Sequence, residues 1–132
     1  MSAPFKIDGV AYNVTVPEDG IRRNYNLRDG KAAGWAKSGR KRRDVQGTYF
    51  NYEIDIETSQ LNYEQYDALF EVLCEPVESH SIEVPYGQTT LIFDAAIYSG
   101  GDTLHRIHST GKLWKGLTIK FEALAPQKVP LL

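Results

Sequence analysis

The stretch Thr48-Tyr-Phe-Asn-Tyr-Glu-Ile-Asp-Ile-Glu57 alternates apolar and polar side chains from Phe50 onward. Because successive side chains of a β-strand point to opposite faces, this pattern predicts a strand with one buried face and one face in water. Strands of this kind belong to antiparallel sheets. The side chains expected in the core are Phe50, Tyr52, Ile54 and Ile56, and those expected in water are Asn51, Glu53, Asp55 and Glu57.

The same period of two recurs along most of the chain. Turn-forming residues separate the alternating segments: Pro17-Glu-Asp-Gly20 predicts a turn, and Ser99-Gly-Gly-Asp102 predicts a hairpin-type turn between two strands. Further strands are predicted over Val10–Val16, Ile21–Leu27, Ser79–Val84, Thr89–Tyr98, Thr103–Thr110 and Leu113–Leu124.

One segment, Tyr63–Cys74, has the period of a helix. Asn62 is a favourable N-cap residue, and Pro76 cannot continue a helix. The apolar stripe of this segment consists of Tyr66, Leu69, Phe70 and Leu73, with Glu64, Glu71 and Glu75 on the other side. We therefore expect one amphipathic helix, over about residues 62–74, that packs on the sheet with one face.

Together these elements predict a mainly β protein: an antiparallel β-sandwich or a partly closed barrel with one flanking α-helix. The length of 132 residues fits a single domain, which we place at residues 1–125. Pro126 and Pro130 predict a loose C-terminal tail over residues 126–132.

Basic residues are concentrated between Ile21 and Arg43. Nine of the fifteen Lys and Arg residues lie there beside a single acid, Asp29, which gives this stretch a formal charge of +8. The other six basic residues stand against sixteen acids, so the rest of the chain carries −10. Residues 28–47 lack a strong apolar period and include four glycines. We expect them to form a long basic loop, called here the basic arm, on an acidic body.

Three interpretations of the basic arm are open. It could bind phosphates with Trp35 stacked on a base, dock on an acidic neighbour in an assembly, or remain a solvated loop. The acidic body favours assembly, because it repels nucleic acid and because opposite charges on one chain are self-complementary. The candidate assembly interface consists of Arg22, Arg23, Arg28, Lys31, Trp35, Lys37, Arg40, Lys41, Arg42 and Arg43.

The sequence shows no catalytic pattern. His105 and His108 would point to opposite faces of a strand, and His80 is interpreted as a satisfied histidine at a sheet margin. Cys74 is interpreted as buried filler, because the negative end of a helix disfavours a thiolate. The acids of Thr48–Glu57 are interpreted as a solvated strand face. We therefore expect no enzyme, no cofactor and no metal. A hydrolase that binds sugars through the aromatic residues is a rival interpretation.

The cysteine count and the hydropathy bear on the compartment. Cys74 is the only cysteine, so no internal disulfide can form, and a reducing compartment is expected. No apolar run approaches the ~20 residues that a membrane-spanning helix needs, so we expect no contact with a membrane.

Four parts of the chain resemble a known group of proteins. They are Phe5-Lys-Ile-Asp-Gly9, Gly47-Thr-Tyr-Phe-Asn-Tyr52, Tyr66-Asp-Ala-Leu-Phe-Glu-Val-Leu73 followed by Glu75-Pro76, and Trp114-Lys-Gly-Leu-Thr-Ile-Lys-Phe121. They look like short proteins encoded in phage and prophage tail regions of Gram-positive bacteria. The order of elements is also similar to the tail-tube fold, a β-sandwich or barrel with one flanking helix and a long loop between early strands.

The resemblance implies a non-enzymatic structural component of a phage or prophage tail: a tube protein, a baseplate adaptor or a completion protein. It implies subunits that form rings, commonly hexameric, in which the loop at Arg28–Gly47 contacts a neighbouring subunit or ring. The expected partners are further copies and other tail proteins. The expected location is the cytoplasm of a bacterial host before assembly and the virion tail afterwards. The alternative is a small nucleic-acid-binding β-barrel that uses the basic arm.

Overall fold

The computed structural model describes residues 4–29, 34–35, 41–42, 45–57, 63–109 and 111–129. These residues form a mainly β fold with a single helix, as predicted. In chain order the elements are β1 (Lys6–Ile7), β2 (Val10–Ala11), β3 (Ile21–Asp29), β4 (Gly34–Trp35), β5 (Lys41–Arg42), β6 (Val45–Ile56), α1 (Tyr63–Leu73), β7 (His80–Tyr86), β8 (Thr89–Ala96), β9 (Thr103–His108), β10 (Gly111–Lys115) and β11 (Leu117–Ala123).

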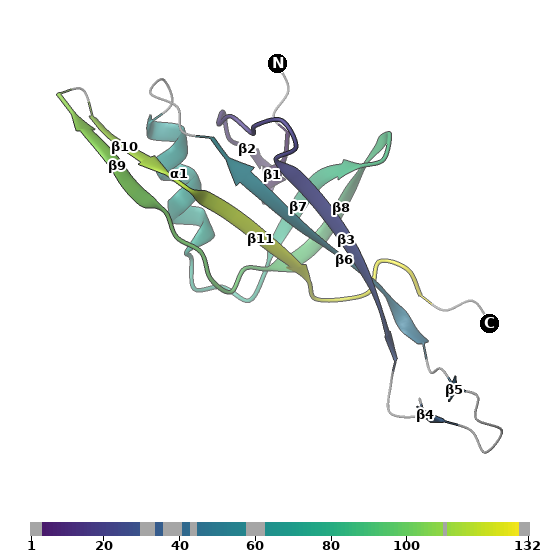
Figure 1. The fold of residues 1–132 in the computed structure, drawn as a ribbon. Helices are drawn as coiled ribbons and strands as arrows, with labels where there is room; N and C mark the ends of the chain where they lie inside the picture. Colours follow the sequence, from purple (N-terminus) through teal and green to yellow (C-terminus); the bar gives the residue numbers. More distant parts are fainter. Residues whose placement is uncertain are drawn as a thin grey trace.

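Seven strands form one antiparallel sheet in the order β2-β1-β7-β8-β11-β6-β3. The sheet folds over at β11, because Leu117–Phe121 pairs with β6 whereas Glu122–Ala123 pairs with β8. Strands β3, β6 and β11 form one layer, and β8, β7, β1 and β2 form the other (Figure 1). The sheet ends at β2 and β3, so it is a folded sandwich and not a closed barrel.

The strand that the alternation predicted most clearly, β6, lies inside the sheet between β3 and β11. Tyr52, Ile54 and Ile56 are buried, as predicted. Tyr52 also links the two layers: its hydroxyl donates to the carbonyl oxygen of Pro85 at 2.8 Å, and its ring lies 6.0 Å from that of Phe93. The hydroxyl group of this buried tyrosine therefore has a hydrogen-bond partner, as buried polar groups require.

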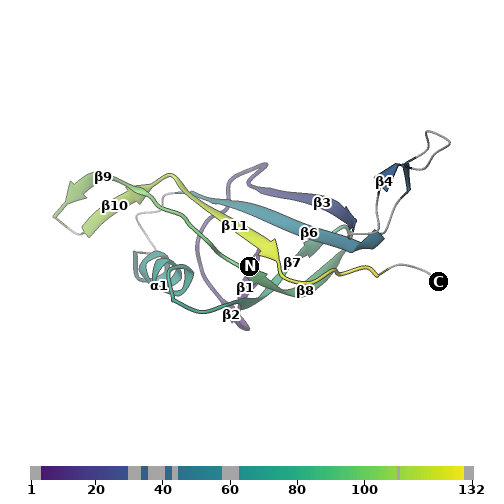
Figure 2. The ribbon, with the colours of Figure 1, turned by 90° about the horizontal axis from the view of Figure 1, so that it is seen from below.

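Helix α1 lies on the same side of the β6–β11 layer as β7 and β8 (Figure 2). Leu69 and Tyr66 are buried in the core, and Phe70 and Leu73 are half-buried, which confirms the predicted stripe. Burial of a leucine side chain contributes roughly 1.5–3 kcal/mol, so Leu69 is a principal anchor of the helix. The proposed cap, Asn62, lies outside the described residues.

The predicted strand over Val10–Val16 is wrong as a continuous strand. Regular pairing ends at Ala11, and Thr15 forms only an isolated bridge with Glu57 at the end of β6. The chain therefore crosses here from the β1 layer to the β6 layer, and no single ladder can accompany it. Tyr12 is buried in this crossing, whereas Val10 is 51% exposed.

Two predictions near the C-terminal half also need correction. Ser99–Asp102 is not a hairpin turn, since β9 pairs with β10 and not with β8. The predicted strand over Leu113–Leu124 is broken at Gly116, whose φ of +80° suits glycine and redirects the chain from the β9–β10 ribbon into the sheet. The apolar side chains of this segment are nevertheless buried on both sides of the break: Leu113, Leu117, Ile119, Phe121 and Ala123.

The tail predicted to be loose from Pro126 is bonded to β6 as far as Lys128. The amide of Gln127 donates to the carbonyl oxygen of Thr48 at 2.9 Å. The amide of Thr48 donates to the carbonyl oxygen of Lys128 at 2.8 Å. The Gln127 side-chain oxygen accepts the amide of Phe50 at 2.8 Å. Proline has no amide hydrogen to donate to a ladder, but the residues that follow it do. The prolines of the tail therefore predicted a looser segment than the structure has.

Candidate assembly surface

Strands β3 and β6 form a long hairpin that runs beyond the sandwich (Figure 1). Their pairing continues to Asp29 opposite Val45, so the predicted loop over residues 28–47 begins and ends inside a ladder. Strands β4 and β5 pair with each other beyond the tip of this hairpin, and the β9–β10 ribbon lies at the opposite end of the molecule (Figures 1 and 2).

The ten candidate interface residues fall into three groups. Arg22, Arg23 and Arg28 lie on β3 and have described side chains. Trp35 lies on β4, and Lys41 and Arg42 lie on β5, where the backbone pairing alone is described. Lys31, Lys37, Arg40 and Arg43 lie outside the described residues.

Arg22 is paired within its own chain. Its guanidinium donates to both oxygens of Asp55, at 2.8 and 3.1 Å, and to Glu53 at 3.1 Å. The hydrogen bonds from Arg22 are the main cause that lowers the pKa of Asp55, and the hydrogen bond from the Thr118 hydroxyl lowers it further. The same carboxylates raise the pKa of Arg22. The charge of Arg22 is thus balanced internally, which sequence reasoning missed because its partners lie more than thirty residues away.

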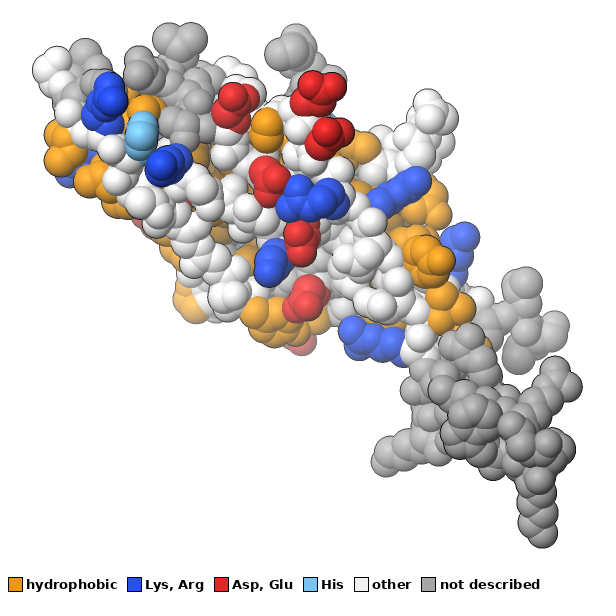
Figure 3. All heavy atoms as spheres, in the orientation of Figure 1, with side chains coloured by type: hydrophobic (Ala, Val, Ile, Leu, Met, Phe, Trp, Pro, Cys, Tyr) orange, Lys and Arg blue, Asp and Glu red, His pale blue; other side chains and the backbone are white. Residues whose placement is uncertain are grey.

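The outer face of β3, β6 and β11 carries interleaved charges (Figure 3). Glu53 on β6 lies between Arg22 on β3 and Lys120 on β11 in the cross-strand register. Opposite charges on facing positions stabilise neighbouring strands. Among the described residues, no group of three or more His, Cys, Asp or Glu side chains is placed to hold a metal ion. Glu53 and Asp55 are instead balanced by Arg22 on β3, and Glu53 also faces Lys120 on β11.

Arg23 and Arg28 lie over aromatic rings. The guanidinium of Arg23 is 5.3 Å from the ring centre of Tyr86. The guanidinium of Arg28 is 4.3 Å from the ring centre of Tyr49. Cation–π contacts of this kind hold a side chain while leaving its charge in place. Arg23 and Arg28 therefore differ from Arg22, because neither forms an ion pair with an acid among the described residues.

A groove of about 510 Å³ opens at the base of the hairpin. Tyr25 is 68% exposed and Leu27 is 44% exposed there, although both share a strand face with Ile21, which is half-buried against the core. The other lining residues are Arg23, Asn24, Thr48, Phe50, Tyr86 and Lys128. The period of two of a strand places Tyr25 and Leu27 on one face, but only the tertiary structure decides that this face is uncovered here.

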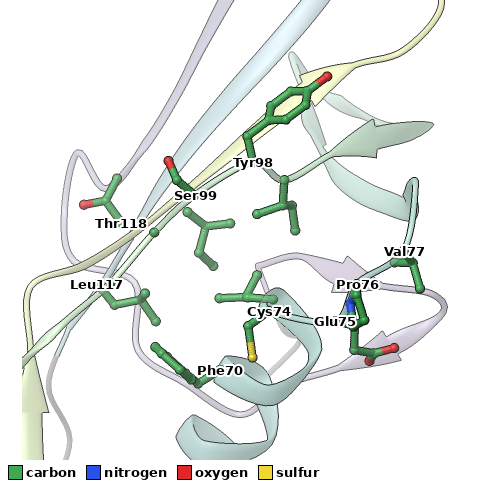
Figure 4. A pocket seen from close by; sticks show the side chains of 14 residues that line it. Phe70, Cys74, Glu75, Pro76, Val77, Tyr98, Ser99, Leu117 and Thr118 are labelled. Atoms are coloured by element: carbon green, nitrogen blue, oxygen red, sulfur yellow. The ribbon is translucent and has the colours of Figure 1, made fainter.

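A second hollow, of about 410 Å³, lies beside the C-terminal end of α1 (Figure 4). Its lining includes Phe70, Cys74 and Leu117. Cys74 is exposed rather than buried, and its Sγ lies 3.5 Å from the carbonyl oxygen of Glu71. The carboxylate of Glu75 and the ring of Tyr98 point away from the hollow, so these groups do not converge with the thiol (Figure 4).

His80 is only 4% exposed and lies on the buried face of β7. Its Nδ1 is 2.7 Å from Asp8, whose carboxylate also accepts the amide of Ser81 at 2.9 Å. The contact with His80, and then that with Ser81, lowers the pKa of Asp8. Nε2 of His80 has no hydrogen-bond partner among the described residues, so this histidine is satisfied at one nitrogen. The pair ties the β1–β2 turn to β7.

A helix capable of crossing a membrane would need to be longer and more apolar than α1, and the described part of the chain holds no such helix. A comparison with models of known protein families found no match, and a search of curated proteins found none either.

Proposed function

We propose that this chain is a non-enzymatic structural component of a phage or prophage tail that assembles through protein–protein contacts, as rings. Its role is that of a tube protein, a baseplate adaptor or a completion protein. Its partners are further copies and other tail proteins, first in the host cytoplasm and then in the virion tail.

The observation that carries this proposal is the projecting β3–β6 hairpin. The stretch Ile21–Arg43 carries +8 on a chain whose remainder carries −10. At the base of the hairpin, Tyr25 and Leu27 expose apolar surface beside Arg23. A projection that is both apolar and cationic supports a protein partner with apolar and acidic surface, rather than solvent, as its surroundings.

The mechanism is multivalent. Each exposed ion pair contributes roughly 0–1 kcal/mol, so one contact cannot hold two copies together. Closure of a ring turns the last contact into an intramolecular one and thereby supplies the missing affinity. The resulting assembly is sensitive to salt, because ions screen the contacts between exposed charges.

The experiment compares two double variants by light scattering and negative-stain microscopy at low and high salt. Arg40→Ala with Arg42→Ala removes two charges from the basic arm. Lys6→Ala with Lys120→Ala removes two charges outside the candidate interface, from residues that lie opposite Glu83 and Glu53 respectively in the strand register. We expect wild type and the second variant to form rings or stacks that dissociate as salt rises, and the first variant to remain monomeric.

Two outcomes contradict the proposal. One is a wild-type protein that stays monomeric at every concentration and salt. The other is DNA binding without self-association, steeply weakened by salt and abolished by Arg40→Ala with Arg42→Ala, which would favour the nucleic-acid alternative.

A further inference from the structure

A hollow of about 270 Å³ lies between α1 and β10. Its aromatic wall consists of Tyr66, Phe70 and Trp114, and its carboxylates are Asp67, Glu71 and Asp102. The volume lies below the roughly 300–1,000 Å³ of pockets that hold small molecules, and therefore suits the end of one long side chain.

The hollow is electronegative. Within the described part of the chain, no ion pair involves Asp67, Glu71 or Asp102. Tyr66 donates its hydroxyl to Asp102 at 2.7 Å, which fixes that carboxylate at the rim. Burial is the main cause that raises the pKa of Tyr66. The nearby carboxylates of Asp102 and Asp67 raise it further, as expected where negative charge is concentrated.

Carboxylates next to aromatic rings are suited to a guanidinium or ammonium group. The carboxylates accept charge-assisted hydrogen bonds, and the ring faces attract the cation through their quadrupoles. The lysines on the adjacent strand β10, Lys112 and Lys115, form no ion pair with the hollow among the described residues. Neither lysine therefore neutralises these carboxylates in this structure, which leaves the hollow open to a cation from another molecule.

We infer that this hollow receives an arginine or lysine of the basic arm of a second copy of this chain. The inference rests on the proposed function and names the surface on which the arm docks. The outer end of the β3–β6 hairpin, at Asp29 and Val45, lies at the opposite end of the molecule from α1 and β10 (Figures 1 and 2), which carry most of the residues that line the hollow, so the strands of the hairpin do not approach the hollow of their own copy. The contact is therefore heterologous, and repetition of such a contact generates rings or filaments.

The test uses a synthetic peptide with the sequence of Ala36–Gln46, which carries five basic residues and one acid. The protein carries Trp35→Phe, so that Trp114 becomes its only tryptophan and its fluorescence reports on the hollow. We expect the peptide to change this fluorescence at low salt and to bind at least about tenfold more weakly after Asp67→Asn with Glu71→Gln. The matched control, Asp94→Asn with Glu122→Gln, removes two exposed acids elsewhere and should bind normally.

A charge exchange provides a second measurement. The variant Asp67→Lys with Glu71→Lys should reject the natural peptide and bind one in which Arg40 and Arg42 are replaced by Glu. Both helix residues are exposed, so circular dichroism should show the wild-type fold in each variant.

The inference fails if Asp67→Asn with Glu71→Gln binds the peptide as tightly as its control. It also fails if these variants assemble like wild type, since the arm then docks on another surface while the proposed assembly stands. Peptide binding in the hollow by a chain that never self-associates would overturn the second copy as occupant, and the proposed function with it.

Discussion

The substitution Gln127→Ala tests whether the C-terminal segment is part of the fold. The side-chain oxygen of Gln127 accepts the amide of Phe50 at 2.8 Å, and its removal leaves that half-buried donor unpaired. An unpaired buried donor costs about 1–3 kcal/mol. One contribution has the opposite sign: Nε2 of Gln127 is buried without a partner among the described residues, and alanine removes it as well. We expect the free energy of unfolding to fall by about 1–2 kcal/mol.

For 132 residues, a specific entropy of about 2.1 cal/mol/K per residue converts each kcal/mol into roughly 4 °C of melting temperature. The midpoint of Gln127→Ala should therefore lie about 4–8 °C below that of wild type. Circular dichroism at low protein concentration and high salt measures it without interference from assembly. Hydrogen exchange gives a local readout, because the Phe50 amide should exchange faster whereas that of Ile54 should change only with global stability.

Lys128→Ala is the matched control. Lys128 contributes its carbonyl oxygen to the amide of Thr48, and this bond does not depend on the side chain. Exposed substitutions of this kind usually change stability by no more than about 0.5 kcal/mol. The reasoning is refuted if Gln127→Ala is as stable as wild type, or if Lys128→Ala destabilises the protein to the same extent.

Four further predictions concern buried or paired side chains. The lowered pKa of Asp8 means that its contribution to stability is complete above its ordinary value of 3.8 and is lost as pH falls through the lower folded pKa. Asp8→Asn, which weakens the pair with His80, should therefore reduce the loss of stability below about pH 4, measured as urea midpoints against pH. Tyr66→Phe removes the bond to Asp102 and should cost about 0.5–1.5 kcal/mol in urea unfolding. In wild type, a spectrophotometric titration should show Tyr66 ionising well above the ordinary tyrosine pKa of 10.0. Leu69→Ala should cost about 2–5 kcal/mol by the same unfolding measurement, because the side chain is fully buried.

The sequence by itself determined the elements whose pattern is local. Alternation around Tyr52 and Ile54 predicted β6 and its buried face, and the stripe through Leu69 predicted α1 to within a residue at each end. These features follow from the periods of strand and helix, which depend only on neighbouring residues. The uneven distribution of charge was equally visible, because it needs no knowledge of contacts.

The tertiary structure decided everything that depends on residues far apart in the chain. It paired Arg22 with Asp55, bonded Gln127 to Phe50 across 77 positions, and placed Asp102 against Tyr66. It also left Tyr25 uncovered on a face that is buried elsewhere in the sheet. No periodic pattern encodes such contacts, because the folding of the sheet at β11 and the position of α1 select which distant side chains meet.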